Sequence, residues 1–232
     1  MAAHAVTTQR PAAIDKTFAD LSPAMANVLE EVALTTTYPT GAVLFTQAEP
    51  PRGAFALRRG RMKLSVSARD GRTLILRMVE PGEILGIASV ISGHEYEATA
   101  EAQEPCEISF IRQSDLLRLM RLHGELAVWV TQHLSEDYTS TCREIRDLML
   151  SDSASEKLAR LLVGWLDHST ESKRPCQLKM AMTHEEIGQM IGTSRETVTR
   201  LFAGFKKQRL IEQNGSTLVI PNRVALESLI SA

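Results

Sequence analysis

The sequence predicts an α+β protein with three parts: an N-terminal β-roll (jelly roll), a long helix and a C-terminal winged helix-turn-helix. Short apolar runs separated by glycine, proline and charged turns fill residues 36–112. Residues 125–150 then contain neither glycine nor proline. Two short amphipathic helices and a hairpin are expected over residues 183–220. The expected limits are 1–124 for the β-roll with an N-terminal helix, 125–150 for the long helix and 151–232 for the last part.

The β-roll is predicted by many short strand-like segments at even spacing, which are typical of sandwiches and jelly rolls. Asp70-Gly71 lies between two of these segments and is a strong hairpin signal. The segments expected to form strands are 42–45, 53–57, 62–67, 73–79 and 107–111.

The long helix carries apolar residues at spacings of three and four, which predicts a coiled-coil-like seam. A helix over 125–150 would be about 39 Å long at 1.5 Å per residue. This length favours packing against a second copy of the chain, although a helix packed on its own β-roll is the alternative. The expected seam residues are Val130, Leu134, Tyr138, Thr141, Ile145 and Leu148.

The first helix of the C-terminal pair has clear start and stop signals. Thr183 followed three residues later by Glu186 forms a capping box. Gly192 can end the helix because glycine readily takes the left-handed conformation of a sharp turn. Thr193 or Ser194 can then cap the second helix.

The second helix separates apolar from polar residues. Val198, Leu201, Phe202 and Phe205 fall at helical spacing and are expected to pack inward. Arg195, Glu196, Thr199 and Arg200 fall on the opposite side, near the end of a recognition helix that reaches base edges in DNA. A small helical hairpin with a solvated charged face is the alternative reading.

A hairpin is expected directly after the second helix. Residues 210–213 and 217–220 are strand-like, and Asn214-Gly215 between them favours a tight turn. A helix pair followed by such a hairpin is a winged helix, whose wing can touch a phosphate backbone.

The segments Ile187-Gly188-Gln189, Ser194-Arg195-Glu196-Thr197-Val198-Thr199-Arg200 and Leu210-Ile211 resemble the DNA-binding domain of the Crp/Fnr family of bacterial transcription regulators. The resemblance extends to the β-roll, which is similar to the cyclic-nucleotide-binding type, and so covers the chain from about residue 20. It implies a homodimer on double-stranded DNA, TGTGA-like half-sites in a palindrome, and RNA polymerase as a further partner. It implies base reading by Arg195, Glu196 and Arg200. The residues expected to support DNA binding are Thr183, Ser194, Thr197, Thr199, Lys206 and Lys207.

The expected effector pocket departs from the family pattern. In the family's cyclic-AMP binders a glutamate follows the second cassette glycine, here Gly86, and an arginine-serine pair holds the cyclic phosphate. Ile87 replaces the glutamate, and Tyr96 and Glu97 replace the pair. On the long helix, Thr141 and Cys142 align with the hydroxyl pair that reaches the adenine, so one hydroxyl is replaced by a thiol. We therefore expect no cofactor and no cyclic-AMP binding in the usual manner.

Other effectors stay open, including an unidentified small molecule. An iron–sulfur cluster of the Fnr type is not expected, because no cysteine precedes Cys106. Haem binding through His94, His123 or His133 and oxidation of Cys142 are alternatives, although a lone histidine or cysteine is more often structural. Cys106 and Cys176, the latter placed in a Lys-Arg-Pro loop, have no evident partner.

Composition limits the function classes. The net charge is −2 and 44% of residues are hydrophobic, so positive charge must be local. No apolar run reaches membrane-spanning length, no signal peptide is evident, and three cysteines make no disulfide framework, which together predict a cytoplasmic protein. No nucleophile–base pair, metal-ligand spacing or P-loop indicates an enzyme. A small-molecule-binding module without DNA binding is the alternative, and the base-reading set argues against it.

Overall fold

The computed structural model describes residues 17–149, 153–168, 176–180, 182–215 and 217–230. For residues 143, 144, 147–149, 168 and 176–179 only the backbone is described. Contacts divide the chain into two compact units. The first contains the residues up to 64 together with 78–134, and the second contains 65–77 together with the residues from 135 onward. The division therefore falls inside the long helix and not at either of its ends.

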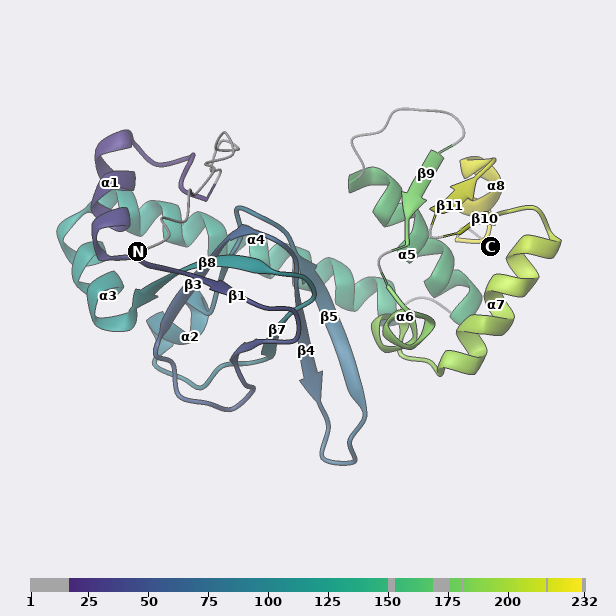
Figure 1. Ribbon diagram of the computed structural model, residues 1–232, viewed down its shortest axis with the longest axis horizontal. Coiled ribbons are helices and arrows are strands. Elements are labelled where there is room, and N and C mark those ends of the chain that lie inside the picture. Colours follow the sequence, from purple (N-terminus) through teal and green to yellow (C-terminus); the bar gives the residue numbers. More distant parts are fainter. Residues whose placement is uncertain (1–16, 150–152, 169–175, 181, 216, 231–232) are drawn as a thin grey trace, which may run out of the picture. The chain divides into compact units, whose positions relative to one another are not determined.

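Two four-stranded sheets form the β-roll, with orders β1-β8-β3-β6 and β2-β7-β4-β5. Figure 1 shows β4 and β5 side by side as a hairpin at the edge of the second sheet. The five expected segments form β2, β3, β4, β5 and β8. The sequence did not indicate β1, which is polar and mostly exposed, the two-residue β6, or β7. The bounds are β1 Leu34–Tyr38, β2 Val43–Phe45, β3 Gly53–Arg59, β4 Met62–Ser67, β5 Thr73–Val79, β6 Ile84–Leu85, β7 Thr99–Ala102 and β8 Cys106–Arg112.

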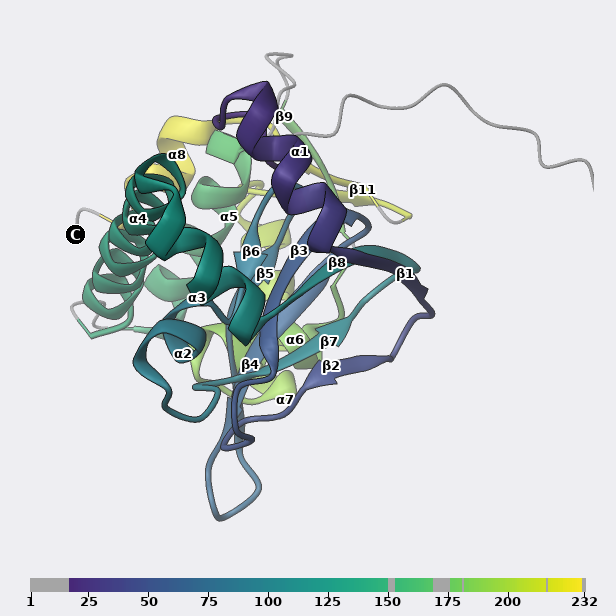
Figure 2. The ribbon, with the colours of Figure 1, turned by 90° about the vertical axis from the view of Figure 1, so that its left-hand side faces the viewer.

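Three short helices cover the sheet that contains β3 and β8 (Figure 2). They are α1 (Pro23–Val32), α2 (Ile87–Ser92) and α3 (Gln113–Leu122). Ser22 caps α1, since its hydroxyl oxygen accepts a hydrogen bond from the amide of Met25 at 3.3 Å. The apolar faces of these helices join β3 and β8 in one core, together with the start of the next helix.

The long helix α4 spans Gly124–Met149, one residue earlier at each end than expected. Its first turns pack into the β-roll core, which corrects part of the predicted seam. Val130 is 0% exposed and belongs to that core, so it has no surface left for a second subunit. Leu134 packs partly against the same core. Tyr138 and Ile145 are 72% and 55% exposed.

Of the remaining seam residues, Thr141 is exposed and the side chain of Leu148 lies outside the described residues. None of the helices in the described ranges is long and apolar enough to cross a membrane.

Within the second unit, the described residues from 153 onward form a winged helix-turn-helix. Helix α5 (Ala154–His168) precedes strand β9 (Cys176–Lys179), the helix pair α6 (His184–Ile191) and α7 (Arg195–Lys207), the hairpin β10 (Glu212–Asn214) and β11 (Thr217–Ile220), and α8 (Arg223–Glu227). The three strands form an antiparallel sheet in the order β10-β11-β9. Strand β9 was not predicted, and Cys176 opens this strand and does not lie in the expected loop. A separate core joins α5, α6, α7, the wing and α8.

Candidate nucleic-acid interface and effector pocket

Helix α6 begins with the predicted capping box. The backbone N–H of Thr183 donates to Oε2 of Glu186 at 2.8 Å, and Oγ1 of Thr183 accepts from the Glu186 amide at 3.2 Å. Gly192 ends the helix in the left-handed region at φ +68°. These local bonds fix both ends of the first helix of the pair.

The turn between α6 and α7 is tight because two backbone segments meet at a glycine. The amide of Thr193 donates to the carbonyl oxygen of Gly188 at 2.8 Å. A Cβ atom added to Gly188 would lie 2.7 Å from the carbonyl oxygen of Thr193. Only a glycine leaves room for this approach, so Gly188 helps to set the angle between the two helices.

Helix α7 buries the apolar residues that the sequence predicts. Val198, Phe202 and Phe205 are at most 3% exposed, and Leu201 is partly buried. The predicted base-reading residues Arg195, Glu196 and Arg200 are all exposed. Glu196 and Arg200 lie away from the buried stripe, as expected, whereas Arg195 lies two turns before Phe202 on the same side of the helix, which corrects its expected place opposite the apolar residues. The recognition helix is thus anchored through its apolar stripe while its charged residues remain free to meet a ligand.

Several of the predicted supporting residues position the recognition helix. Ser194 caps α7 by accepting from the amide of Thr197 at 3.2 Å. The hydroxyl oxygen of Thr197 accepts from Nη2 of Arg200 at 3.1 Å, which orients that guanidinium along the helix. Lys206 donates from Nζ to Oε1 of Gln213 at 2.6 Å and so connects α7 to strand β10 of the wing.

The pKa of the Glu196 carboxyl is lowered, mainly by a hydrogen bond from its own backbone N–H and then by the hydroxyl of Ser194. Arg195 and Arg200 lower the pKa further. The side chain is therefore a carboxylate at neutral pH and can accept a hydrogen bond from a cytosine amino group.

His184 belongs to this surface, although the sequence analysis did not identify it. Its Nδ1 atom lies 2.9 Å from Oγ1 of Thr199, and its ring stacks on Phe202 with centroids 4.8 Å apart. Burial lowers the pKa of His184, and the charges of Lys206 and Arg195 lower it further. The only signal in the sequence is its place as the residue after the helix cap, which does not reveal contacts with α7.

Two residues of the predicted phosphate-binding cassette, Ile87 and Tyr96, are buried in the β-roll. Gly86 precedes α2 in the left-handed region at φ +78°. Ile87, the first residue of α2, is 3% exposed and belongs to the core shared with α1 and α3. An apolar residue here contributes to core packing and offers no acceptor to a ribose hydroxyl.

Tyr96 is 2% exposed and closes the cassette onto β3. Its ring stacks on Phe45 with centroids 4.1 Å apart, and a Cβ atom added to Gly86 would meet the ring at 2.8 Å. Its hydroxyl group bonds to the backbone of Gly53 and Arg52. Tyr96 is thus a buried structural residue.

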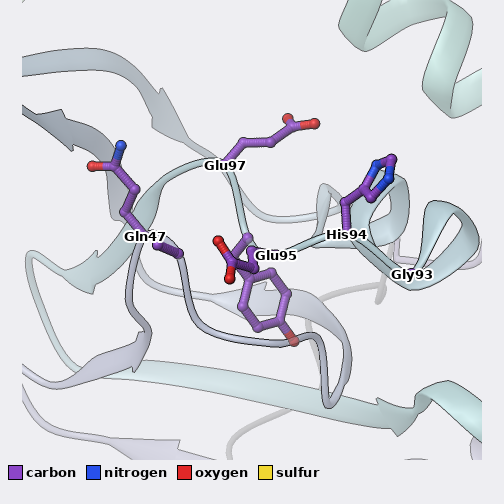
Figure 3. Close-up of a pocket in the computed structure, with 7 residues that line it drawn as sticks. Gln47, Gly93, His94, Glu95 and Glu97 are labelled. Carbon is purple, nitrogen blue, oxygen red and sulfur yellow. The ribbon is translucent and has the colours of Figure 1, made fainter.

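An open hollow of about 560 Å³ lies beside the cassette, lined by Gln47, Ala48 and residues 93–97. Figure 3 shows Gln47 on one side of it and His94 on the other, with Glu95 and Glu97 between them. Glu97 is exposed, so the hollow carries two carboxylates and is poorly suited to a phosphate. Thr141 and Cys142, which align with the family's adenine-contacting pair, are exposed on α4.

The histidines and cysteines considered as sensors have different surroundings. His94 is exposed, His123 follows α3, and His133 packs on Trp129 with ring centroids 4.2 Å apart. Cys106 is buried, and burial raises the pKa of its thiol, whereas Cys142 is exposed. The described part of the chain contains no cluster of three or more His, Cys, Asp or Glu residues that could hold a metal ion.

Comparison with known families agrees with both halves of the fold. Residues 35–123 match the cyclic nucleotide-binding domain family, and residues 156–229 match the Crp-like helix-turn-helix domain family. The cAMP-activated global transcriptional regulator CRP of Pasteurella multocida is 27% identical over 184 residues, which cover 79% of this chain and 88% of that protein. The cAMP-activated global transcriptional regulator Vfr of Pseudomonas aeruginosa is 25% identical over 170 residues, or 72% and 79% of the two chains.

Solved structures show the same fold at lower identity. FixK2 from Bradyrhizobium japonicum superposes with a TM-score of 0.75 at 21% identity, covering 87% of this chain and 98% of that chain. The c-di-GMP responsive global regulator CLP of Xanthomonas campestris has a TM-score of 0.73 at 18% identity, covering 87% and 100%. The fold of a β-roll, a long helix and a winged helix-turn-helix is therefore shared with these two proteins.

Proposed function

Because the chain belongs to the Crp/Fnr family of transcription regulators, we propose that it is a homodimer that reads a TGTGA-like palindrome without cyclic AMP. The observation that carries this proposal is the exposure of Arg195, Glu196 and Arg200 in the first two turns of a helix whose apolar residues are buried. Acting in transcription, the protein would meet DNA and RNA polymerase in the cytoplasm.

Each base-reading residue has a chemical role in this proposal. Arg195 and Arg200 can each donate two hydrogen bonds to O6 and N7 of a guanine in the major groove. The ionised Glu196 can accept from the amino group of a cytosine. A TGTGA half-site with its complementary strand offers two guanines and two cytosines. It can therefore supply both guanines for the arginines and a cytosine for Glu196, so the residues fit the proposed sequence.

Dimerisation follows from the exposed part of α4 and from the symmetry of the proposed site. Tyr138 and Ile145 are seven residues apart and exposed, so they lie on one face of the helix. A two-fold dimer would cover these side chains and present one recognition helix to each half-site. The seam proposed here uses the second half of α4, since Val130 is already buried within its own chain.

Independence from cyclic AMP is supported by the chemistry of the residues in the predicted cassette. Tyr96 carries no positive charge for a cyclic phosphate, and its hydroxyl is already bonded to the backbone of Gly53. Ile87 offers no acceptor to the ribose, and Glu97 would repel the phosphate. The relatives described as cAMP-activated are only 23–27% identical, so their ligand is not carried over to this chain.

Binding to a TGTGA-N6-TCACA duplex, without added nucleotide and at fixed salt, tests the proposal. Arg195→Ala and Arg200→Ala should each weaken binding by about 1–3 kcal/mol and relax preference for the palindrome. Lys207→Ala is the matched control, because loss of a phosphate contact should weaken all duplexes alike and reduce the salt dependence. Equal affinity of the unmodified protein for a scrambled duplex would refute the sequence reading.

Calorimetry with cyclic AMP tests the second half of the proposal. No binding heat is expected at micromolar nucleotide, and the affinity for the palindrome should not change when cyclic AMP is added. Micromolar binding accompanied by tighter DNA binding would contradict ligand independence.

A further inference from the structure

His184 lies against the helix that is proposed to meet DNA. It is the first residue of α6, and it lies against one stripe of the recognition helix. The stripe consists of Arg195, Thr199, Phe202 and Lys206, which follow one another at spacings of four, three and four residues. The imidazole stacks on Phe202 and contacts the hydroxyl of Thr199, the two middle residues of the stripe. The cationic residues Arg195 and Lys206 are at its two ends.

The hydrogen bonds of Thr199 determine which ring nitrogen of neutral His184 carries the proton. The Thr199 hydroxyl donates its single proton to the carbonyl oxygen of Arg195 at 3.0 Å. Oγ1 can then only accept from His184, so the proton of the neutral ring lies on Nδ1. The other nitrogen, Nε2, holds a lone pair and can donate a hydrogen bond only after it takes up a second proton.

The charges around His184 favour the neutral ring when DNA is absent. From α7, Lys206 and Arg195 oppose protonation and act together with burial to lower the pKa of His184. On α6 itself the carboxylates are Glu185, which is exposed, and Glu186, which is bonded to Thr183 in the capping box. A phosphate placed beside this stripe would offset the two cations and reverse the balance.

We propose that His184 is a DNA phosphate ligand that takes up one proton from the solvent when the duplex binds. Nε2 accepts the proton, and the resulting imidazolium donates Nε2–H to a phosphate oxygen while Nδ1–H stays bonded to Thr199. The bond to Thr199 keeps the ring in place, so the recognition helix need not move when the contact with the phosphate forms. The inference rests on the proposed function, because it needs α7 to face DNA.

The expected signature is a pH-dependent affinity. Affinity should rise as pH falls between the pKa of His184 in the complex and its lower pKa in the free protein. The limiting slope is about tenfold per pH unit for each His184 engaged, because each contributes at most one proton. The affinity should be independent of pH above the pKa of His184 in the complex. It should level off below the pKa of His184 in the free protein.

Fluorescence anisotropy of the full chain with the palindromic duplex, at pH 6, 7 and 8 and constant salt, measures this slope. His184→Gln retains an amide that can donate to Thr199 but cannot titrate, so the slope should disappear. His184→Arg should bind tightly at every pH. His94→Gln, which changes an exposed histidine of the β-roll, is the matched control and should keep the slope of the unmodified protein.

Calorimetry of the unmodified protein in two buffers of different ionisation enthalpy gives a second readout that needs no variant. It should detect proton uptake on DNA binding near pH 7. No uptake together with firm DNA binding, or an equal slope in His184→Gln, would overturn the inference.

The proposed function and this inference can fail separately. A phosphate contact is independent of sequence, so the slope should also appear with a scrambled duplex at lower salt. A pH-dependent affinity for both duplexes without preference for the palindrome would contradict recognition of the palindrome and support the role of His184. Preference for the palindrome with an affinity that does not depend on pH would support that recognition and contradict the role of His184. Lack of binding to any duplex would refute both proposals.

Discussion

The hydroxyl of Tyr96 donates a hydrogen bond to the carbonyl oxygen of Gly53 at 2.7 Å and accepts one from the amide of Gly53 at 3.2 Å. The same oxygen also lies 3.1 Å from the amide nitrogen of Arg52. One buried side chain of the predicted cassette thus provides hydrogen-bond partners for the backbone groups where β3 begins. The residue that departs from the expected phosphate-binding pattern is therefore also a structural residue of the β-roll.

Tyr96→Phe should destabilise the β-roll by about 1–3 kcal/mol, because it leaves buried backbone groups of Gly53 without partners. Chemical denaturation followed by circular dichroism measures the change. Tyr38→Phe, at a half-buried position at the end of β1 and away from the proposed dimer seam, is the control and should be close to neutral. A neutral result for Tyr96→Phe would show that water replaces the hydroxyl and that the cassette is less closed than described.

Gly188→Ala should weaken DNA binding and stability together. The added methyl group would meet the carbonyl oxygen of Thr193 at 2.7 Å, so the turn must open at a cost of about 1–3 kcal/mol. Gly204→Ala is the matched control inside α7, where an added Cβ meets nothing within 4 Å. It should stabilise the domain by about 0.5–1 kcal/mol, since alanine is the better helix former. Thermal unfolding and DNA titration of both variants distinguish strain at the turn from a general effect of alanine.

Ile145→Asp should shift the chain from dimer to monomer. Two carboxylates facing each other across the proposed seam would cost several kcal/mol, or roughly a hundredfold or more in the dimer dissociation constant. Analytical ultracentrifugation over a range of protein concentrations measures the shift. Thr139→Asp places the same charge on an exposed position about 120° away from Ile145 around the helix and should leave the dimer intact. Unchanged dimerisation in Ile145→Asp would place the seam elsewhere.

The parts that could be predicted from the sequence are those set by local rules. The capping box of Thr183 and Glu186, the left-handed Gly192 and the cap at Ser194 each depend on residues at most three positions apart. The exposed face of α7 and the turn at Asn214-Gly215 follow from periodicity and turn chemistry in the same way. These signals were enough to place Arg195, Glu196 and Arg200.

The features that sequence reasoning missed depend on contacts between distant segments. Val130 and Tyr138 belong to the same series of residues spaced by three and four along the long helix. Only the packing of α4 on the β-roll buries Val130 and leaves Tyr138 exposed. His184 and Thr199 meet across two helices at a separation of fifteen residues. Tyr96 was identified as a departure from the family pattern, but its bonds to Gly53, forty-three residues away, could not be inferred.

The stability of the C-terminal unit should fall below about pH 6.5 in a way that depends on His184. In the unfolded chain a histidine titrates near its ordinary pKa of about 6.5, whereas burial, Lys206 and Arg195 lower the pKa of His184 in the folded protein. Between these two values the unfolded chain binds more protons, so stability is full above the unfolded pKa and is lost as pH falls toward the folded one. Urea unfolding at pH 7.5 and 5.5 should therefore show a larger drop in midpoint for the unmodified protein than for His184→Gln. Equal drops in the two proteins would mean that the ring is not held neutral in the absence of DNA.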